Sequence, residues 1–299
     1  MNSKKTYLIT GAGTGFGKEI ALRLAQTGEK VIAGVETMSE VATLILDAQE
    51  KEIDLQVEKL DITDPLDRAR AGLWDVDVLL NNAGISLGGS LVDIPEVILR
   101  YQFEVNVFGT MFLTQQIARE MVKKRCGKIV FVSSVHGLVA DPISGPYCGT
   151  KFALEAFAES LSYELQEFNV EVAVINPGPY LTGFNDREFE AYKLWKDDPT
   201  NRLFDYEKMA FPFVQFKNID PVVKETIEVL KGTTKNYRNV IPNMLGIYAK
   251  KRQNDLWNKQ TDKDLGKRHS LIQNAYESEP GTTLMGELAN KIKSKLKRS

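Results

Sequence analysis

The sequence is poor in cysteine and histidine, with two of each among its 299 residues. Cys126 and Cys148 form no C-x-x-C motif, so the sequence supports neither a disulfide framework nor a cysteine-ligated zinc site, and we expect no bound metal. Such cysteine usage is typical of a reducing compartment, and we expect a cytoplasmic protein.

Long apolar runs and an excess of positive charge are also missing. No apolar run approaches the ~18 residues of a membrane-spanning helix, so we expect neither a signal peptide nor a membrane span. A formal net charge of −2 and a pI near 5.9 argue against a nucleic-acid partner. What remains, 43% hydrophobic and 26% charged residues, is the composition of a globular protein with a sizeable core.

A glycine-rich loop follows the first predicted strand, Thr6–Thr10, and precedes an apolar-periodic helix. Gly11, Gly15 and Gly17 would let the backbone approach a pyrophosphate, whose charge a helix N-terminus favours. A plain loop is the alternative, but the order strand, glycine turn, helix favours dinucleotide binding.

The second predicted strand, Lys30–Val35, ends at Glu36, where the ribose of an adenosine would lie. A carboxylate there accepts hydrogen bonds from ribose hydroxyls and repels a 2′-phosphate, so we favour NAD over NADP. The alternative is that Glu36 is a solvated turn residue. We expect Ser39 to cap the next helix, and a third strand to lead to Asp61, near the adenine.

A buried strand is predicted over 76–80, and it ends in the polar and small residues 81–84, which would line the crevice of a parallel sheet. Helical periodicity then extends over 95–124, with Asn106 inside it. An asparagine within a helix is mildly unfavourable, which indicates either a functional role or a satisfied buried amide.

Tyr147 and Lys151 stand four positions apart at the start of a predicted helix, and therefore on one helical face. A free tyrosine, with a pKa near ~10, needs a stabilised phenolate to act as an acid or base at neutral pH. At ~4 Å the lysine charge would supply about 4 kcal/mol. Y-x-x-x-K alone is a common pattern. Ser134 closes a predicted strand, however, and its hydroxyl could hold a substrate oxygen together with the Tyr147 phenol.

Together these motifs resemble the classical type of the short-chain dehydrogenase/reductase family over about residues 5–245. The matching pieces occur in the family's order: Thr10-Gly11-x-x-x-Gly15-x-Gly17, Asn81-Asn82-Ala83-Gly84, Asn106, Ser134, Tyr147-x-x-x-Lys151, and Pro177-Gly178 followed by Thr182. The resemblance implies an α/β fold, a single doubly wound Rossmann-type sheet of seven parallel strands with helices on both faces. It also implies an NAD(P)-dependent oxidoreductase that acts on the CH–OH group of an alcohol, or on the corresponding ketone.

The resemblance assigns roles to individual residues. Tyr147 would be the general acid/base, Lys151 would bind the nicotinamide ribose and lower the pKa of Tyr147, Ser134 would hold the substrate oxygen, and Asn106 would help to position a water in a proton relay. The implied cofactor-binding residues are Gly11, Thr14, Gly15, Phe16, Gly17, Glu36, Asp61, Ile62, Asn82, Ala83, Gly84, Tyr147, Lys151, Pro177, Gly178 and Thr182.

Three features depart from the family pattern. The segment between Asp61 and Asn81 is short, so its helix should be stunted or displaced. Val35 stands where NAD-dependent members usually carry aspartate, and Glu36 where many NADP-dependent members carry arginine. The chain also continues beyond a typical member, so we predict a catalytic domain over 1–243 and a helical C-terminal extension over 244–299.

Substrate specificity is expected from a lid over about 182–220, because loops at this edge of the sheet carry specificity. Its aromatic residues are Phe184, Phe189, Tyr192, Trp195, Phe204, Tyr206, Phe211, Phe213 and Phe216. We predict that they cover an apolar alcohol or ketone; the alternative is a satellite core. Phe184 and His136 are candidate substrate contacts, and an ordinary loop histidine is the alternative for His136.

The extension is the least informative region. Residues 250–267 are highly polar and predict a loosely packed helix, and 283–297 predict an amphipathic helix that packs on its own or a neighbouring subunit. A peripheral membrane contact is the alternative for this helix. The resemblance implies a homodimer or homotetramer built on the helices of Asn106 and Tyr147. A catalytically silent sensor or interaction protein on the same fold, or a membrane-associated scaffold, are the alternative functions.

Overall fold

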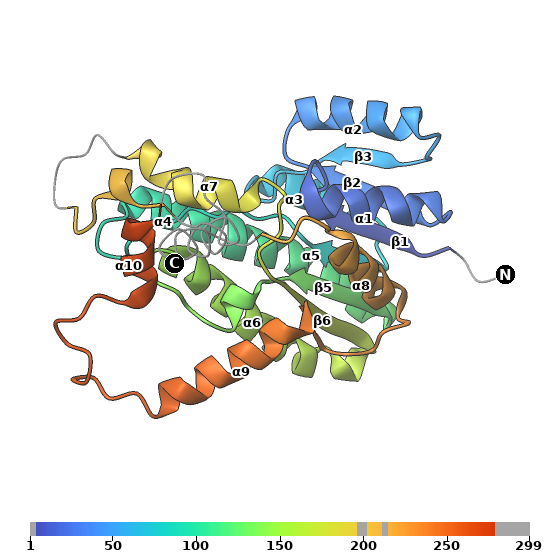
Figure 1. Ribbon diagram of the computed structural model, residues 1–299. Helices are drawn as coiled ribbons and strands as arrows, with labels where there is room; N and C mark the ends of the chain where they lie inside the picture. The colour runs from blue at the N-terminus through green and yellow to red at the C-terminus, as the bar shows by residue number, and fades with distance from the viewer. Residues whose placement is uncertain (1–3, 196–201, 211–214, 279–299) are drawn as a thin grey trace, which may run out of the picture.

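The computed structural model describes residues 4–195, 202–210 and 215–278. In these residues a parallel sheet of seven strands has the order β3-β2-β1-β4-β5-β6-β7 (Figure 1). The strands are β1 Thr6–Thr10, β2 Lys30–Val35, β3 Gln56–Lys59, β4 Val78–Asn81, β5 Gly127–Val132, β6 Val170–Pro177 and β7 Arg238–Ile241. The predicted doubly wound α/β fold is confirmed, and its strand order reverses between β1 and β4, where such folds bind ligands.

Helices cover both faces of the sheet (Figure 1). They are α1 Gly15–Gln26, α2 Met38–Glu50, α3 Pro65–Ala71, α4 Glu96–Phe103, α5 Thr110–Lys124, α6 Gly145–Glu164, α7 Phe184–Glu190, α8 Asp220–Lys231, α9 Asn243–Trp257 and α10 Ser270–Glu277. Short 3₁₀ turns occupy Val135–Gly137, Gln166–Phe168, Ala191–Leu194 and Tyr206–Lys208. Helix α3 is short, as the sequence predicts from the short segment that contains it.

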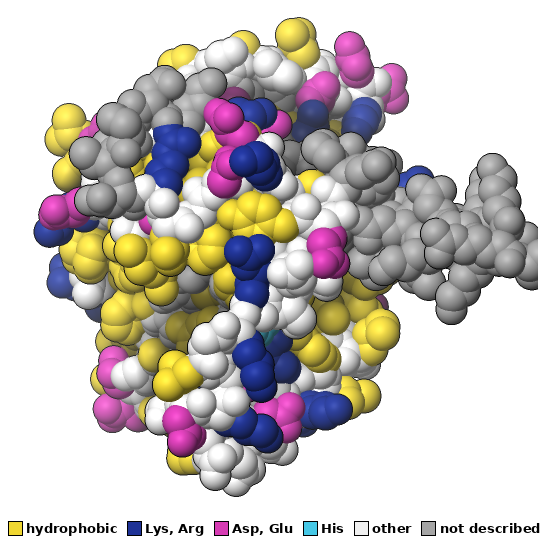
Figure 2. All heavy atoms as spheres, turned by 60° about the vertical axis from the view of Figure 1, so that its left-hand side comes forward, with side chains coloured by type: hydrophobic (Ala, Val, Ile, Leu, Met, Phe, Trp, Pro, Cys, Tyr) yellow, Lys and Arg dark blue, Asp and Glu magenta, His cyan; other side chains and the backbone are white. Residues whose placement is uncertain are grey.

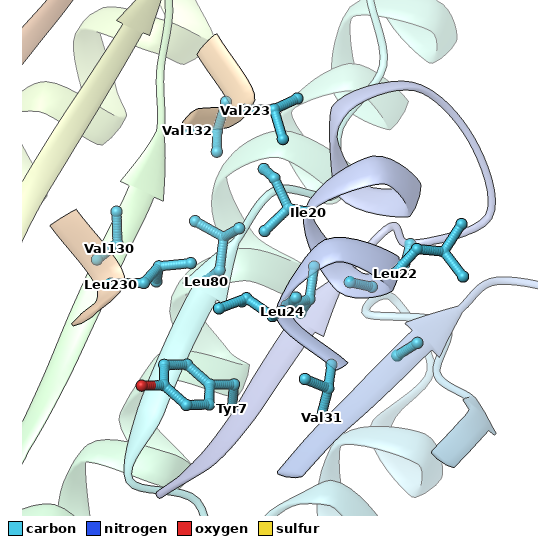
Figure 3. Packing of buried hydrophobic residues seen from close by; sticks show 14 of the residues in the cluster. Tyr7, Ile20, Leu22, Leu24, Val31, Leu80, Val130, Val132, Val223 and Leu230 are labelled. Atoms are coloured by element: carbon cyan, nitrogen blue, oxygen red, sulfur yellow. The ribbon is translucent and has the colours of Figure 1, made fainter. Parts of the chain in front are cut away.

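Two apolar cores, one on each face, fix the sheet between the helices. Tyr7 and Ile9 of β1 belong to the core under α1 and α8, whereas Leu8 projects into the core under α5 and α6. Figure 3 shows Ile20 of α1 beside Val223 of α8, above the sheet. Each fully buried aliphatic side chain contributes about 1.5–3 kcal/mol, so these layers hold the strand ends, and the loops on them, in fixed positions.

Helix α2 begins earlier than the sequence predicts, and its cap is Thr37 rather than Ser39. The Thr37 side chain accepts a hydrogen bond from the Glu40 amide at 3.2 Å, and the Glu40 carboxylate accepts one from the Thr37 amide at 3.0 Å. This reciprocal capping box satisfies two amides at once. The prediction of Ser39 as the cap is therefore wrong.

The helix predicted over 95–124 is confirmed over 96–124, but its middle is π-helical. A π-helical turn, Glu104–Gly109, separates α4 from α5 and contains Asn106. Such turns insert an extra residue into a helix and are frequent at functional sites. Here the turn lets Gly109 approach the Ile62 carbonyl so closely that no side chain would fit.

The C-terminal extension forms an arm that leaves the sheet and returns to the molecule (Figure 1). Helix α9 follows β7 and ends at Trp257, so the helix predicted to reach residue 267 is too long; α10 then packs beside the lid, where the Ala210 amide donates to the Ala275 carbonyl at 2.7 Å. The amphipathic helix predicted over 283–297 lies outside the described residues. Among the helices that are described, none has both the length and the apolarity needed to cross a bilayer.

Candidate active site

A cavity lies at the carboxyl edge of the sheet, between the glycine loop, the ends of β4, β5 and β6, and the lid helix α7. Figure 2 shows the molecule turned toward this side, where hydrophobic side chains gather around a hollow and alternate with charged ones. The predicted site residues that line the cavity are Thr14, Gly15, Phe16, Asn82, Gly84, Ser134, His136, Tyr147, Lys151, Pro177, Gly178, Thr182 and Phe184. The structure therefore brings together residues from six separate segments.

The glycine loop has the shape that a pyrophosphate requires. Gly15 has a φ of +57° and lines the cavity, and a Cβ on Gly17 would collide with the Gly11 carbonyl and the Asn82 amide group. Thr14, the N-cap of α1, makes no side-chain capping hydrogen bond. The first amides of α1 are therefore available to an anion, and the loop fits a dinucleotide.

Asn82 and Ala83 support this loop from the neighbouring strand. The Asn82 side chain donates to the carbonyls of Thr10 at 2.9 Å and Gly11 at 3.1 Å, and the amides of Asn82 and Ala83 both donate to Thr10 Oγ1 at 3.0 Å. Gly11, with a φ of +62°, lies directly against Ala83. Gly11, Gly17 and Ala83 thus shape the cavity from behind rather than line it.

Asn106 lies in the π-helical turn and is fully buried behind the cavity. Its amide group accepts from the Ile85 amide at 2.8 Å and donates to the Ile85 carbonyl at 2.8 Å and to Thr150 Oγ1 at 3.0 Å. Thr150 in turn donates to the Tyr147 carbonyl at 2.7 Å. The asparagine therefore connects the segment after β4 to the first turn of α6, a connection that the spacing of residues in the sequence does not predict.

Tyr147, in the first turn of α6, is buried beside Ser134, which follows β5. Burial raises the pKa of the Tyr147 phenol well above its ordinary value and the nearby Glu188 carboxylate raises it further, while a hydrogen bond with the Ser134 side chain acts in the opposite direction. The sequence predicts that Lys151 lowers this pKa. In the structure the pKa is raised instead, because desolvation of the phenolate dominates, and the group that acts to lower it is Ser134.

Lys151 is also buried, one turn along α6. Its Nζ donates to the Val132 carbonyl at 2.9 Å and lies 5.6 Å from the centre of the Tyr147 ring. Burial lowers the pKa of Lys151 to about 8, against the opposing effect of Glu155. A Cβ on Gly84 would lie 3.8 Å from this Nζ and 3.2 Å from Asn106 Oδ1, so glycine leaves room for both groups.

Two further rings contact the phenol ring, and the sequence predicts both residues as substrate contacts. His136 and Phe184 meet the Tyr147 ring edge to face, with centroid distances of 6.0 and 5.8 Å. Phe184 comes from the lid helix α7 and His136 from the turn after β5. The phenolic oxygen therefore lies in an apolar and aromatic setting with one imidazole.

Glu188 is a residue of this site that the sequence does not reveal. It is 3% exposed, its Oε2 accepts a hydrogen bond from Ser86 Oγ at 2.8 Å, and its Oε1 has no partner among the described residues. Its position on α7 depends on how the lid folds back over the loop after β4, where the Gly88 amide donates to the Glu188 carbonyl at 2.9 Å. A glutamate in a polar stretch carries no sequence signal of burial.

The residues predicted to face the adenosine lie next to the cavity and do not line it. Glu36 is exposed at the end of β2; partial burial and the carboxylates of Asp61 and Glu40 raise its pKa, while Arg187 and Lys59 act to lower it. Asp61 Oδ1 accepts hydrogen bonds from the amide and the hydroxyl of Thr63, at 2.8 and 2.7 Å. The carbonyl of the neighbouring Ile62 accepts a hydrogen bond from Arg68 of α3 at 2.7 Å.

Pro177 and Gly178 end β6, and Thr182 follows them across the cavity from the glycine loop. A Cβ on Gly15 would lie 3.6 Å from the Thr182 side chain, so the two segments face one another. Arg187 of α7 also lines the cavity, and the sequence did not single it out.

Most lid aromatics do not cover the cavity, contrary to the prediction. Tyr192, Trp195, Phe204 and Tyr206 pack with Ile143, Met209 and Ala275 in a separate apolar cluster, which is the satellite core weighed as the alternative. Phe216 packs on Tyr180 at 5.1 Å. Phe211, Phe213 and the side chain of Phe189 lie outside what the structure describes. Phe184 alone of the described lid aromatics lines the cavity.

Residues 5–193 match the family model described as short chain dehydrogenase. The chain is 36% identical over 190 residues to the uncharacterized oxidoreductase YusZ of Bacillus subtilis, a match that covers 60% of this chain and 66% of that protein. It is 32% identical over 184 residues to the 3-ketodihydrosphingosine reductase of Bacteroides thetaiotaomicron, with coverage of 60% and 65%. The matched part thus spans just under two thirds of the length of these relatives.

Solved structures with the same fold share less sequence. A short-chain dehydrogenase from Sphingobium yanoikuyae, solved in complex with NADPH, superposes with a TM-score of 0.67 at 19% identity and covers 88% of this chain and 99% of its own. At that identity the likeness shows the fold alone.

Proposed function

The chain belongs to the short-chain dehydrogenase/reductase family, and we propose that it transfers a hydride between a nicotinamide cofactor and a secondary alcohol or ketone, with Tyr147 as the general acid/base. The observation that supports this best is the position of the Tyr147 phenol, buried in the cavity beside Ser134 and Lys151. The glycine loop faces the same cavity.

The nicotinamide, when bound, supplies or accepts the hydride. The residues of the chain handle the proton and the oxygen. In reduction Tyr147 donates its phenolic proton to the carbonyl oxygen, which Ser134 holds with its hydroxyl; in oxidation the phenolate takes the proton of the alcohol. Burial keeps the phenol protonated at neutral pH, which is the form that proton donation in the reductive direction requires.

We assign Lys151 two tasks on this surface. Its ammonium group lies within reach of both the phenol ring and the Gly84 turn, so it can bind the nicotinamide ribose and favour the phenolate during turnover. Asn106 fixes the backbone at Ile85 and the first turn of α6, and we propose that its further part in a proton relay depends on water.

We propose NAD as the preferred cofactor. Glu36 and Asp61 place carboxylates at the carboxyl end of β2, where they would accept hydrogen bonds from ribose hydroxyls and repel a 2′-phosphate. Arg187 and Lys59 bring positive charge to the same region and act against this preference. The balance of these charges is directly testable by substitution.

The substrate is proposed to be largely apolar around its reacting carbon. Val135, Pro179, Tyr180 and Phe184 are among the residues that line the cavity, and Phe184 contacts the Tyr147 ring. A relative named as a 3-ketodihydrosphingosine reductase supports a ketone as the substrate. A panel of apolar ketones and secondary alcohols, assayed with NADH, NADPH and their oxidised forms, tests this assignment.

A homo-oligomer is proposed to form through α5 and α6. These helices and the π-helical turn before α5 expose Phe108, Phe112, Phe152 and Phe157, each between 41% and 45% accessible. Light scattering during gel filtration measures the oligomeric state, and a monomer at micromolar concentration would contradict the proposal.

The decisive experiment for the function is Tyr147→Phe. The substitution removes the phenolic proton and keeps the ring that contacts His136 and Phe184, so turnover should fall by at least ~10³-fold while NADH binding, followed by its fluorescence, stays within ~3-fold of wild type. Retained turnover in the variant would refute the assignment of Tyr147.

A further inference from the structure

The C-terminal arm contacts the loop that carries two residues of the active site. Arg252 of α9 donates from Nη2 to the Ala140 carbonyl at 3.1 Å, and the next residue, Gln253, donates to the Leu138 carbonyl at 2.9 Å. This loop runs from Ser134 and His136 to Asp141. The extension, which lies beyond the part of the chain that matches the family model, therefore reaches the cavity wall.

Asp141 connects the arginine to the imidazole. Its Oδ1 lies 3.2 Å from Arg252 Nη1, and its Oδ2 lies 3.5 Å from His136 Nε2. Arg252 is itself held by Tyr248, one turn earlier on α9, whose hydroxyl accepts from Nη1 at 2.6 Å. Because the side chains of Asp141 and His136 are only 17% exposed, the contact between these two residues is shielded from bulk water.

The imidazole ends this chain of contacts inside the cavity. Its ring lies edge to face against Tyr147 at 6.0 Å and lines the cavity. In a histidine whose Nε2 hydrogen points to a carboxylate, Nδ1 accepts when the ring is neutral and donates when it is charged. The charge of His136 thus decides whether the imidazole presents a hydrogen-bond acceptor or a donor beside the phenol.

We propose that Arg252 is a positioning residue for the active site: it holds Asp141 against His136 and so fixes the imidazole beside Tyr147 and favours its protonated form. The arm would then set the charge of the cavity from outside the catalytic domain. Only the kinetic consequence of this inference rests on the proposed function, because the geometry and charge of the imidazole can be measured without turnover.

The charged and titratable groups around His136 act in opposite directions. Burial lowers its pKa, but the hydrogen bond to Asp141 and the carboxylates of Glu188 and Asp141 outweigh burial, so the pKa is raised; the charge of Arg252 acts to lower it. The adjoining phenol of Tyr147 stays neutral because its own pKa is raised. Arg252 therefore has a direct effect and an indirect effect of opposite sign.

This opposition makes the test sharp. If Arg252 were only a nearby positive charge, its removal would raise the pKa of His136. If Arg252 positions Asp141, its removal frees the carboxylate to turn toward solvent, burial then dominates, and the pKa of His136 falls.

The measurement is an NMR titration of the full-length chain with labelled histidine. The chain contains only His136 and His269, so His269→Gln assigns both imidazole signals. We expect Arg252→Gln to lower the pKa of His136 by ~1 unit and to leave that of His269 unchanged. A pKa of His136 that stays the same or rises would overturn the proposal.

Matched variants separate positioning from general effects. Lys251→Gln removes one positive charge from the adjacent, exposed position of α9 and should leave the pKa of His136 in place. Asp141→Asn should lower it as Arg252→Gln does, and the double variant should lower it no further, since both changes break the same contact. Additive shifts in the double variant would contradict a shared contact.

A conservative variant guards against loss of the fold. Arg252→Lys keeps the positive charge and one donor group, so the pKa of His136 should fall less in this variant than in Arg252→Gln. Circular dichroism and NADH binding confirm that each variant is folded. For any ketone that the wild type reduces, Arg252→Gln should move the midpoint of the pH dependence of kcat/KM in the same direction as the NMR titration. If the NMR pKa shifts and the pH dependence of kcat/KM does not, Arg252 still positions Asp141, but the charge of His136 has no part in the reaction.

Discussion

The two walls of the cavity are built by different means. The wall proposed to bind the cofactor, called the cofactor wall, is made of the glycine loop and the turn after β4. It is held by backbone contacts: Asn82 and Thr10 bind carbonyls and amides, and Gly17 lies against the Gly11 carbonyl. The wall proposed to bind the substrate, called the substrate wall, is held by side chains from distant segments, such as Glu188 to Ser86 and Arg252 to Asp141. Backbone contacts demand particular residues at fixed spacings, whereas side-chain contacts can be met in many ways.

The largest expected effect is on the cofactor wall, by Gly17→Val. Its branched side chain cannot fit between the Gly11 carbonyl and Asn82, so the start of α1 must move away from the loop. We expect NADH affinity to fall by more than ~100-fold in a fluorescence titration. Gly246→Ala is the control, because a Cβ there meets Val240 at an ordinary 3.6 Å; equal losses in both variants would show that the loss does not come from the glycine loop.

A large effect with two opposite components is expected for Lys151→Met. Turnover should fall by at least ~100-fold, since the residue lies against Tyr147. Its folded pKa, about 8, lies below the unfolded value of ~10.4, so the unfolded chain binds more protons between these values and the stability of the wild type rises with pH through that window.

At pH 7 the buried charge of Lys151 therefore opposes folding, by roughly 3 kcal/mol at most. The Lys151→Met variant should melt at a higher temperature than wild type at pH 7, and the difference should shrink toward pH 10. Thermal unfolding at the two pH values measures this, and a variant that melts lower at pH 7 would show that the hydrogen bond to Val132 outweighs the desolvation of the ammonium group.

A pair of lid variants sharpens the comparison within the substrate wall. Trp195 is packed in the satellite core, so Trp195→Ala should lower the free energy of unfolding by ~3–5 kcal/mol. Phe184 lines the cavity beside Tyr147, so Phe184→Ala should raise KM for an apolar ketone several-fold with a smaller change in stability. Chemical denaturation and steady-state kinetics on both variants test the assignment; a reversed pattern would place the substrate against the satellite core.

The smallest expected effect concerns the choice between the two nicotinamide cofactors. Glu36→Gln removes one carboxylate and leaves the positive charges of Arg187 and Lys59 in place, so the preference should move toward NADPH by about tenfold. The ratio of kcat/KM for NADPH and NADH gives the result. Glu52→Gln, in the exposed turn after α2, is the control for a general change in charge.

How far the sequence predicts the site follows the same division. Gly15, Ser134 and Tyr147 are all placed on the cavity because each occupies a strand end or a helix start that periodicity can locate. The prediction that the lid aromatics cover the cavity is wrong, because composition cannot distinguish a cavity wall from a satellite core such as that around Trp195. The cap at Thr37 and the π-helical turn were missed because local alternatives differ by only ~1 kcal/mol.

The sequence by itself determined where the glycine loop, the strand ends and the start of the Tyr147 helix lie, because apolar periodicity and glycine turns are local properties, and its resemblance to the family implied the doubly wound α/β fold. The order of the strands in the sheet is seen only in the structure. The tertiary structure alone decided the charges around Tyr147. Glu188, His136 and Asp141 act on the site through burial and through contacts between segments far apart in the chain. Electrostatic energy depends on distance and on exclusion of water, and neither quantity exists before the chain has folded.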